Sequence, residues 1–308
     1  MSKNMAFFVL SVDVEFAWGF IEEIMTNKVK LIYPYLYLLP KSRESIRYLL
    51  QLLDKHEIPA TWAITGSLLI DLYQSRVVTY LSKLYPNLGV LNPTRYERLK
   101  LLWYAPDVVN QIMGSRILHE IASHSFTHPD FWKIPSKIAE IEVRESKKIL
   151  REVCGVEPLT FIFPKNHVNY LGILSKYGFQ VFRSKAKDSK AHSMIKVLQY
   201  FKPTNVVATP KVEKGLWRIP CSLLFQPASK IHLYRLYRDV VYNINYIARK
   251  GGVFHIILHD YSLVSYETKK FFSKIIDIVA RLCMKEKLLC VTMRDLVNFM
   301  KNTCASDN

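Results

Sequence analysis

The strongest constraint on the fold is an alternation of short apolar runs with segments of helical periodicity, repeated along the chain. Residues 6–13 read AFFVLSVD, a run of β-forming residues, and residues 43–56 then place Ile46, Leu50 and Leu53 on one helical face. Apolar strands joined by helices form parallel sheets that are covered on both faces. The chain is therefore expected to be an α/β protein.

The same alternation continues to the end of the sequence. Further strands are expected at 58–65, 120–125, 159–163, 179–183, 216–225, 253–260 and 288–292. Helices are expected at 107–120, 136–155, 167–178, 233–252 and 266–285, with a last helix capped by Thr292 and Asp295. Ser136 and Gly155 fit the N-cap and the stop of the second of these helices.

Seven to eight strands alternating with helices predict an irregular (β/α) barrel, and a doubly wound open sheet is the alternative. The chain contains only 10 glycines, and no glycine-rich phosphate loop follows a predicted strand, which weakens a nucleotide-binding version. No repeat or linker divides residues 1–308, so we expect a single domain with insertions at about 66–118 and 184–215.

The charge of the chain narrows its partners. Lys and Arg number 43 against 26 Asp and Glu, a net charge of +17 that favours anionic glycans, nucleic acid or anionic lipid. The basic residues are scattered, which argues against nucleic acid. The tyrosine-rich stretch LIYPYLYLLP at 31–40 could touch an anionic membrane surface, although packing across the end of the barrel is the favoured interpretation.

The sequence also indicates a compartment. No apolar stretch is long enough to span a bilayer, and the first residues carry no cleavage site for a signal peptide. The 5 cysteines are odd in number and form no CxxC pair, as expected of reduced thiols. We therefore expect a cytoplasmic protein, with a peripheral position at the inner membrane face left open.

Reactive side chains follow four of the predicted strands, and these carboxyl ends form one mouth in an α/β barrel. The residues are Asp13 and Glu15, His124 and His128, Lys165 and Asn166, and His259 and Asp260. The motifs HxxxH and DxE are each common by chance, and only their combination at matching strand ends favours a metal site. Two imidazoles and a carboxylate are a familiar catalytic zinc set, and a second carboxylate can accept a proton from the bound water.

Spacing gives two more specific expectations. Asp13 and Glu15 are two residues apart, so in an extended chain they point to the same face. His124 and His128 are four residues apart and meet if the chain turns helically after the strand. His255 shares a face with His259 but lies deeper in the strand, so we expect it in the core or behind the reactive groups.

Several stretches resemble NodB-type polysaccharide deacetylases of carbohydrate esterase family four. The stretches are FFVLSVDVEFAWG, IPATWAITGSLL, EIASHSFTHPDF, FIFPKNHVNYLGILSKYGFQVFRS and GGVFHIILHD, in order over about residues 5–300. The resemblance implies an irregular (β/α) barrel and metal-dependent removal of N-acetyl groups from amino sugars. The SHSFTH segment is its most specific part.

The resemblance also implies roles for individual residues. Asp13 matches the catalytic base, His124 and His128 match the metal histidines, and His259 matches the general acid. Val14 stands where the family usually has a second aspartate, so Glu15 is expected to be the third ligand of a divalent metal, zinc.

Lys165 lies where many family members carry an arginine that orients the base. A lysine can lower the pKa of Asp13 but cannot clamp it bidentately. Trp18, Trp132 and Asn166 stand beside the motifs and are expected to contact the amino-sugar glycan. Two rivals remain, another metal-dependent amidase of the same fold and a catalytically degenerate glycan-binding relative, for which Val14 and Lys165 would be signs of decay.

Overall fold

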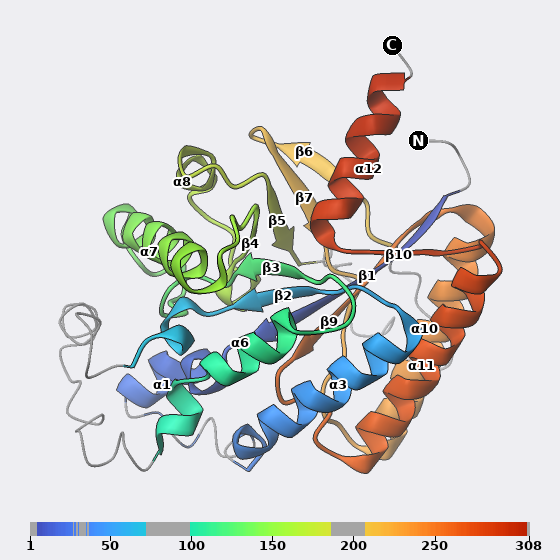
Figure 1. The fold of residues 1–308 in the computed structure, drawn as a ribbon, viewed down its shortest axis with the longest axis horizontal. Helices are drawn as coiled ribbons and strands as arrows, with labels where there is room; N and C mark the ends of the chain where they lie inside the picture. The colour runs from blue at the N-terminus through green and yellow to red at the C-terminus, as the bar shows by residue number, and fades with distance from the viewer. Residues whose placement is uncertain are drawn as a thin grey trace, which may run out of the picture.

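Strand β1 (Ala6–Val14) is fully buried and lies at the centre of a mostly parallel sheet (Figure 1). The computed structural model describes residues 5–26, 28, 30, 35, 37–71, 99–185 and 207–306. Along its length β1 pairs with β9 (Gly252–His259) on one side. On the other side it pairs first with β10 (Leu289–Val291) and then with β2 (Thr61–Ile64).

The sheet continues outward from β2 in an order that confirms the predicted α/β fold with a mostly parallel sheet. The order is β6-β7-β5-β4-β3-β2-β1-β9-β8, and only the β6–β7 pair is antiparallel. The remaining strands are β3 (Glu120–Ser123), β4 (Thr160–Ile162), β5 (Val181–Ser184), β6 (Lys211–Glu213), β7 (Leu216–Pro220) and β8 (Leu223–Leu224).

The predicted single strand at 216–225 is divided into β7 and β8, and this division connects the two ends of the sheet. β7 pairs with β5, whereas β8 pairs with β9. The backbone hydrogen bonds from Cys221 to Ser184 and from Ser222 to His255 continue these two pairings across the break. The same short stretch of chain therefore contacts both edges, as an irregular barrel requires.

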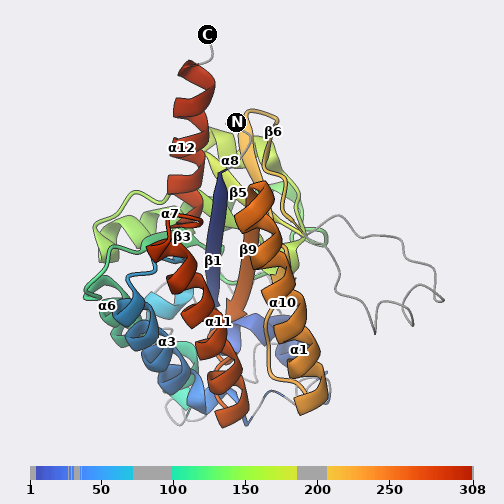
Figure 2. The ribbon, with the colours of Figure 1, turned by 90° about the vertical axis from the view of Figure 1, so that its right-hand side faces the viewer.

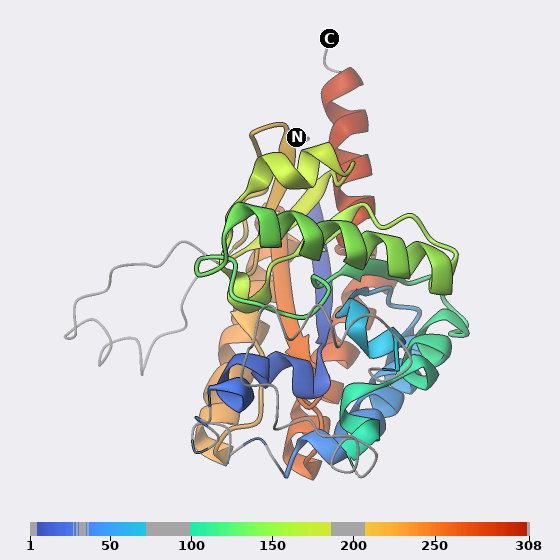
Figure 3. The ribbon, with the colours of Figure 1, turned by 90° about the vertical axis from the view of Figure 1, so that its left-hand side faces the viewer.

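Helices follow the strands and cover the sheet. They are α1 (Ile21–Met25), α3 (Ser42–His56), α6 (Pro106–Met113), α7 (Ser136–Cys154), α8 (Leu171–Lys176), α10 (Lys230–Lys250), α11 (Tyr266–Met284) and α12 (Met293–Ser306). Figure 2 shows α3, α11 and α10 lying over the side of β1 and β9, with α11 in contact with both of the others. Figure 3 shows α7 crossing the opposite side.

The ends of these helices test the local predictions. Thr292 and Asp295 exchange hydrogen bonds at the start of α12, at 2.7 and 3.1 Å, which confirms the predicted cap. Gly155 ends α7 with a φ of 63°, also as predicted. Ser136 is the first helical residue after Pro135 and forms no side-chain cap, so that prediction is wrong.

The predicted insertions at 66–118 and 184–215 lie partly outside the described residues, which omit 72–98 and 186–206. Within the first of them, α6 is shorter than the predicted helix at 107–120, because the chain leaves the helix at Gly114. Most of the tyrosine-rich stretch 31–40 is also outside the described residues. Among the helices that are described, none combines the length and apolar character needed to cross a bilayer.

Candidate active site at the carboxyl ends of the strands

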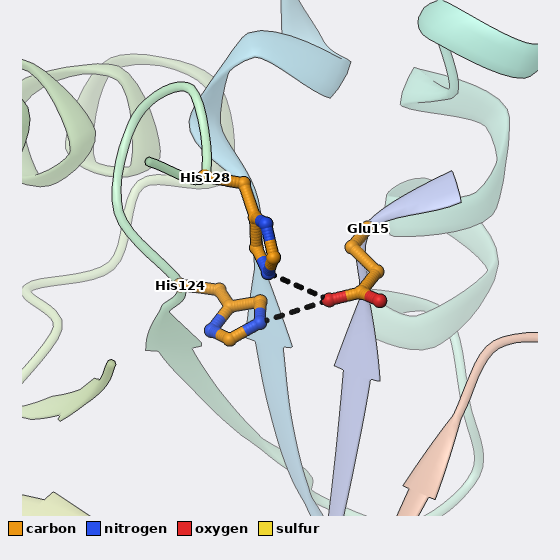
Figure 4. A group of neighbouring side chains, drawn as sticks. All are labelled: Glu15, His124 and His128. Carbon is orange, nitrogen blue, oxygen red and sulfur yellow. Dashed lines mark hydrogen bonds and ion pairs between the residues drawn. The ribbon is translucent and has the colours of Figure 1, made fainter. Parts of the chain in front are cut away.

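Three predicted ligands meet at the carboxyl ends of β1 and β3 (Figure 4). The Oε2 atom of Glu15 lies 3.2 Å from Nε2 of His124 and 2.8 Å from Nε2 of His128. All three side chains are buried. Residues more than a hundred positions apart in sequence thus form one cluster that could hold a metal ion.

Glu15 is positioned by a sharp turn directly after β1. Phe16 has a φ of 47°, in the left-handed region that non-glycine residues rarely adopt. Its N–H donates to Oδ2 of Asp260 at 2.8 Å, which holds the turn. A β-carbon at Gly19 would overlap the Glu15 carboxylate, so this glycine leaves the space that the carboxylate fills.

The loop between the two histidines is held by a buried carboxylate from α7. Glu142 accepts hydrogen bonds from the N–H groups of Phe126 and Thr127, both at 2.8 Å, and from the Thr127 hydroxyl at 2.6 Å. Ser125 accepts the N–H of His128 at 3.0 Å. Ser125 and His128 both have a φ of 63°, so the expected helical turn is wrong and the histidines meet through a tight loop.

The histidine ring nitrogens are disposed as in a metal site. Nδ1 of His124 lies 2.8 Å from the carbonyl oxygen of Ile162, and because a carbonyl only accepts, Nδ1 carries the proton. The lone pair of its Nε2 then faces Glu15. Both ring nitrogens of His128 are buried, and neither has a hydrogen-bond partner among the described residues. A second-shell carbonyl on one imidazole and an unpartnered imidazole fit ligation.

The charges of the cluster oppose the effect of burial. Burial raises the pKa of Glu15, but His128, His259 and His124 together hold it well below its usual range. Burial lowers the pKa of His124, yet the carboxylates of Asp13 and Glu15 outweigh this and raise it above its ordinary value. For His128 burial dominates, and its pKa is lowered.

Asp13 is clamped by an arginine that sequence reasoning missed. Nη1 and Nη2 of Arg183 lie 2.7 and 2.5 Å from the two carboxylate oxygens of Asp13, and the arginine is fully buried. Burial raises the pKa of Asp13, but Arg183 and then His124 bring it below its ordinary value. Arg183 ends the apolar run FQVFR, and a charged residue at a strand's carboxyl end was the available signal.

Lys165 does not contact Asp13, so the expectation that it stands beside the base is wrong. Its Nζ lies 2.8 Å from Glu22 and 3.5 Å from Glu23, because the turn at Pro164–Asn166, with a φ of 56° at Lys165, directs the side chain to α1. The neighbouring Asn166 accepts a hydrogen bond from Nε of Arg183 at 2.8 Å. This contact directs its amide oxygen to the arginine.

His259 lies on the other side of Glu15 and His255 lies deeper. Nε2 of His259 is 3.8 Å from Oε1 of Glu15, and its ring stacks on Tyr261. His255 is fully buried, accepts the Ser11 hydroxyl at Nε2 at 2.8 Å and donates from Nδ1 to the Pro220 carbonyl at 3.2 Å. Burial lowers the pKa of His255 to about 3, so it is neutral and unsuited to proton donation.

The two tryptophans expected to contact sugar differ in exposure. Trp18 is fully buried, and its Nε1 donates to the carbonyl of Trp103 at 2.9 Å, so it offers no ring face to a glycan. Trp132 is 62% exposed and stacks on His167, with ring centroids 3.8 Å apart. His167 in turn lies 2.8 Å from Asp130. Only Trp132 therefore remains as an aromatic platform of the two.

Comparison with known proteins adds to this geometry. Residues 29–182, half of the chain, match the family model described as polysaccharide deacetylase. No protein in a search of curated sequences matches. The matched range begins after Asp13 and Glu15, so those two residues are placed by the structure alone.

Solved structures share the fold at low sequence identity. A candidate polysaccharide deacetylase from Mycobacterium smegmatis is 15% identical, with a TM-score of 0.65 over 98% of this chain and 92% of that chain. The PuuE allantoinase is 13% identical, with a TM-score of 0.60 over 94% and 89%. A family 4 carbohydrate esterase from Streptomyces lividans, in complex with acetate, is 14% identical, with a TM-score of 0.44 over 93% and 92%.

Proposed function

The chain belongs to the polysaccharide deacetylase family, and on this premise we propose that it is a metal-dependent hydrolase. It removes N-acetyl groups from amino-sugar residues of a glycan or a lipid-linked saccharide. The observation that carries the proposal is the meeting of Glu15, His124 and His128 beside the Asp13–Arg183 pair.

Glu15, His124 and His128 would hold the metal, which we propose to be zinc. The unpartnered ring nitrogens of His128 and the fixed tautomer of His124 support this assignment. Two nitrogens and a carboxylate oxygen match the ligands of catalytic zinc, which keep a further position open. When bound, such an ion polarises the acetamide carbonyl and lowers the pKa of the attacking water.

Asp13 accepts the proton of the attacking water as general base. The bidentate contact with Arg183 keeps this buried carboxylate ionised at neutral pH and fixes its orientation. Oδ2 of Asp13 lies 3.8 Å from Nε2 of His124, so the base stands beside the ligand cluster. Asn166 and Ser11 contact the same guanidinium and hold it in the plane that the clamp requires.

His259 donates a proton to the departing amine nitrogen. An amine leaves poorly without this proton, so the reaction needs an acid as well as a base. The partly exposed ring of His259 and its distance of 3.8 Å from Glu15 support the role. Stacking on Tyr261 limits the orientations that the ring can adopt.

Trp132 is the proposed platform for a sugar ring, because its exposed indole lies one loop away from His128. Asn166 is retained as a substrate contact through its amide group. The net charge of +17 supports an anionic or lipid-linked glycan, which a cytoplasmic enzyme would reach at the inner membrane face.

Acetate release tests the proposal. Zinc-loaded protein is incubated with N-acetylglucosamine oligomers, and acetate is measured before and after removal of the metal with a chelator. Metal-dependent acetate release is expected. Bound zinc without acetate release from any amino sugar would instead favour a degenerate glycan-binding protein.

A second candidate is an amidase that acts on a small cyclic amide. The fold shared with the PuuE allantoinase, with its TM-score of 0.60, favours including it. Allantoin therefore serves as a parallel substrate in the same assay. Hydrolysis of allantoin without acetate release from sugars would replace the deacetylase proposal.

A further inference from the structure

Two cysteines outside the candidate active site lie in direct contact. Sγ of Cys283, in the last turn of α11, is 3.0 Å from Sγ of Cys290, in the middle of β10. The other cysteines whose side chains are described, Cys154 and Cys221, are free and have no such contact with a second cysteine. Burial raises the pKa of Cys154 to about 11, which makes that thiol inert.

Backbone hydrogen bonds on both sides bring the two thiols together. After α11, Glu286 donates to the carbonyl of Cys283 at 2.9 Å and adopts a φ of 55°, which reverses the chain. Cys290 is then fixed by the parallel pairing of β10 with β1, where it lies opposite Phe8. The contact therefore follows from the fold, and Figure 1 shows β10 beside the start of α12, at the amino ends of the strands.

The two thiols are chemically unequal. A hydrogen bond from Cys290 lowers the pKa of Cys283, whereas the same contact and burial raise the pKa of Cys290. Residues 284–287 after Cys283 are exposed, and two of them are Lys285 and Lys287. Nearby lysines favour a thiolate and attract anionic reagents, so Cys283 is the accessible nucleophile of the pair.

We propose that Cys283 and Cys290 form a thiol–disulfide exchange site for anionic low-molecular-weight disulfides of the oxidised-glutathione type. The Cys283 thiolate attacks one sulfur of the disulfide, forms a mixed disulfide and releases one thiolate. Cys290 loses its proton to solvent and attacks Sγ of Cys283, which forms the protein disulfide and releases the second thiolate. Two protein thiols are oxidised, and one small disulfide is reduced to two thiols.

The product would tie β10 to the end of α11, at the end of the barrel opposite the candidate active site. It would restrain the strand that pairs with Phe7–Val9 of β1 without touching Asp13 or Glu15. The inference therefore does not depend on the proposed hydrolase, and deacetylase activity is expected to be the same in both redox states.

Two single substitutions distinguish the order of attack. The full-length protein is equilibrated with oxidised glutathione, alkylated and mapped by mass spectrometry. The wild-type protein should yield a Cys283–Cys290 disulfide while Cys154 and Cys221 stay alkylated. Cys290→Ser should trap a glutathione adduct on Cys283, and Cys283→Ser should give little adduct on Cys290.

The proposal is overturned if the wild-type protein forms no Cys283–Cys290 disulfide at any glutathione ratio, or if the pairing involves Cys221 instead. Adduct formation on Cys290 rather than on Cys283 would contradict the assignment of the nucleophile. Amide hydrogen exchange in β10 provides a second readout, because oxidation should slow exchange there if the disulfide restrains the strand.

Discussion

His259 lies directly opposite Asp13 in the parallel register of β9 and β1. One strand therefore presents a carboxylate held by Arg183, and its neighbour presents an imidazole at the same depth, with Glu15 close to both. A hydrolase needs a proton acceptor and a proton donor on two sides of one scissile bond. Adjacent strands in this register deliver the two groups without any movement of the fold.

Replacing the base should separate catalysis from metal binding. Asp13→Asn should lower turnover by at least about 100-fold, the usual size of a general-base contribution, while zinc stays bound. His128→Ala should lose both zinc and activity, because it removes a ligand. Zinc content and acetate release are measured on the same samples, and an active Asp13→Asn enzyme would remove the base assignment.

Arg183 should set the acid limb of the pH–rate profile. Arg183 lowers the pKa of Asp13, so Arg183→Lys, which loses the bidentate clamp, should raise that pKa. The base form then disappears at a higher pH, and kcat/KM should begin to fall at a higher pH than in the wild type. Lys165→Met is the control, because Lys165 pairs with Glu22 and should leave the acid limb in place.

Gly19 should be required for the position of the Glu15 carboxylate. A β-carbon there overlaps the carboxylate, so Gly19→Ala should displace it and weaken zinc binding. We expect a loss of about 10-fold or more in affinity, in the range found when a supporting contact of a ligand is removed. Gly172→Ala in α8 is the matched control, because a β-carbon there meets nothing within 4 Å. Equal zinc affinity in the two variants would contradict the assignment.

Glu142 should hold the histidine loop in its ligating shape. Glu142→Gln replaces an acceptor oxygen by a donor, which faces the donors from Phe126 and Thr127. Zinc affinity should fall by about 10- to 100-fold. Glu145→Gln, on the exposed part of the same helix, should leave zinc binding unchanged, and isothermal titration of the two variants gives the comparison.

His119 should make the fold sensitive to acid. Burial lowers the pKa of His119 to about 4, against about 6.5 in an unfolded chain. Because the folded pKa is depressed, this stability is complete above pH of about 6.5 and is lost as the pH falls towards 4, up to about 3 kcal/mol. In His119→Asn, whose amide oxygen can still accept the Ala60 N–H, denaturant titrations should show a flatter decline.

The sequence predicted the sheet and the cluster because both depend on local pattern and on barrel geometry. Carboxyl ends of parallel strands must meet, so Asp13, Glu15, His124 and His128 could be brought together from their positions alone. Arg183 was missed because the same stretch of chain satisfied a strand pattern, and the partner of its guanidinium is 170 residues away. Lys165 had the expected charge, but its left-handed turn aims it elsewhere.

Exposure was harder to predict than position. Trp18 and Trp132 stand equally close to motifs, but Trp18 is enclosed by Trp103 and Trp132 lies on an open loop. Glu142 occupies an ordinary helical position in α7, and nothing local distinguishes it from the exposed acidic residues of that helix. Such roles depend on long-range packing, which periodicity does not encode.

The most direct test of the metal site is an anomalous-difference map from zinc-loaded crystals, recorded on both sides of the zinc absorption edge. The account predicts a single strong peak at about 2.0–2.2 Å from Glu15, His124 and His128, with Asp13 outside bonding distance. A map without a peak between these three side chains, or with zinc bound elsewhere, would contradict it.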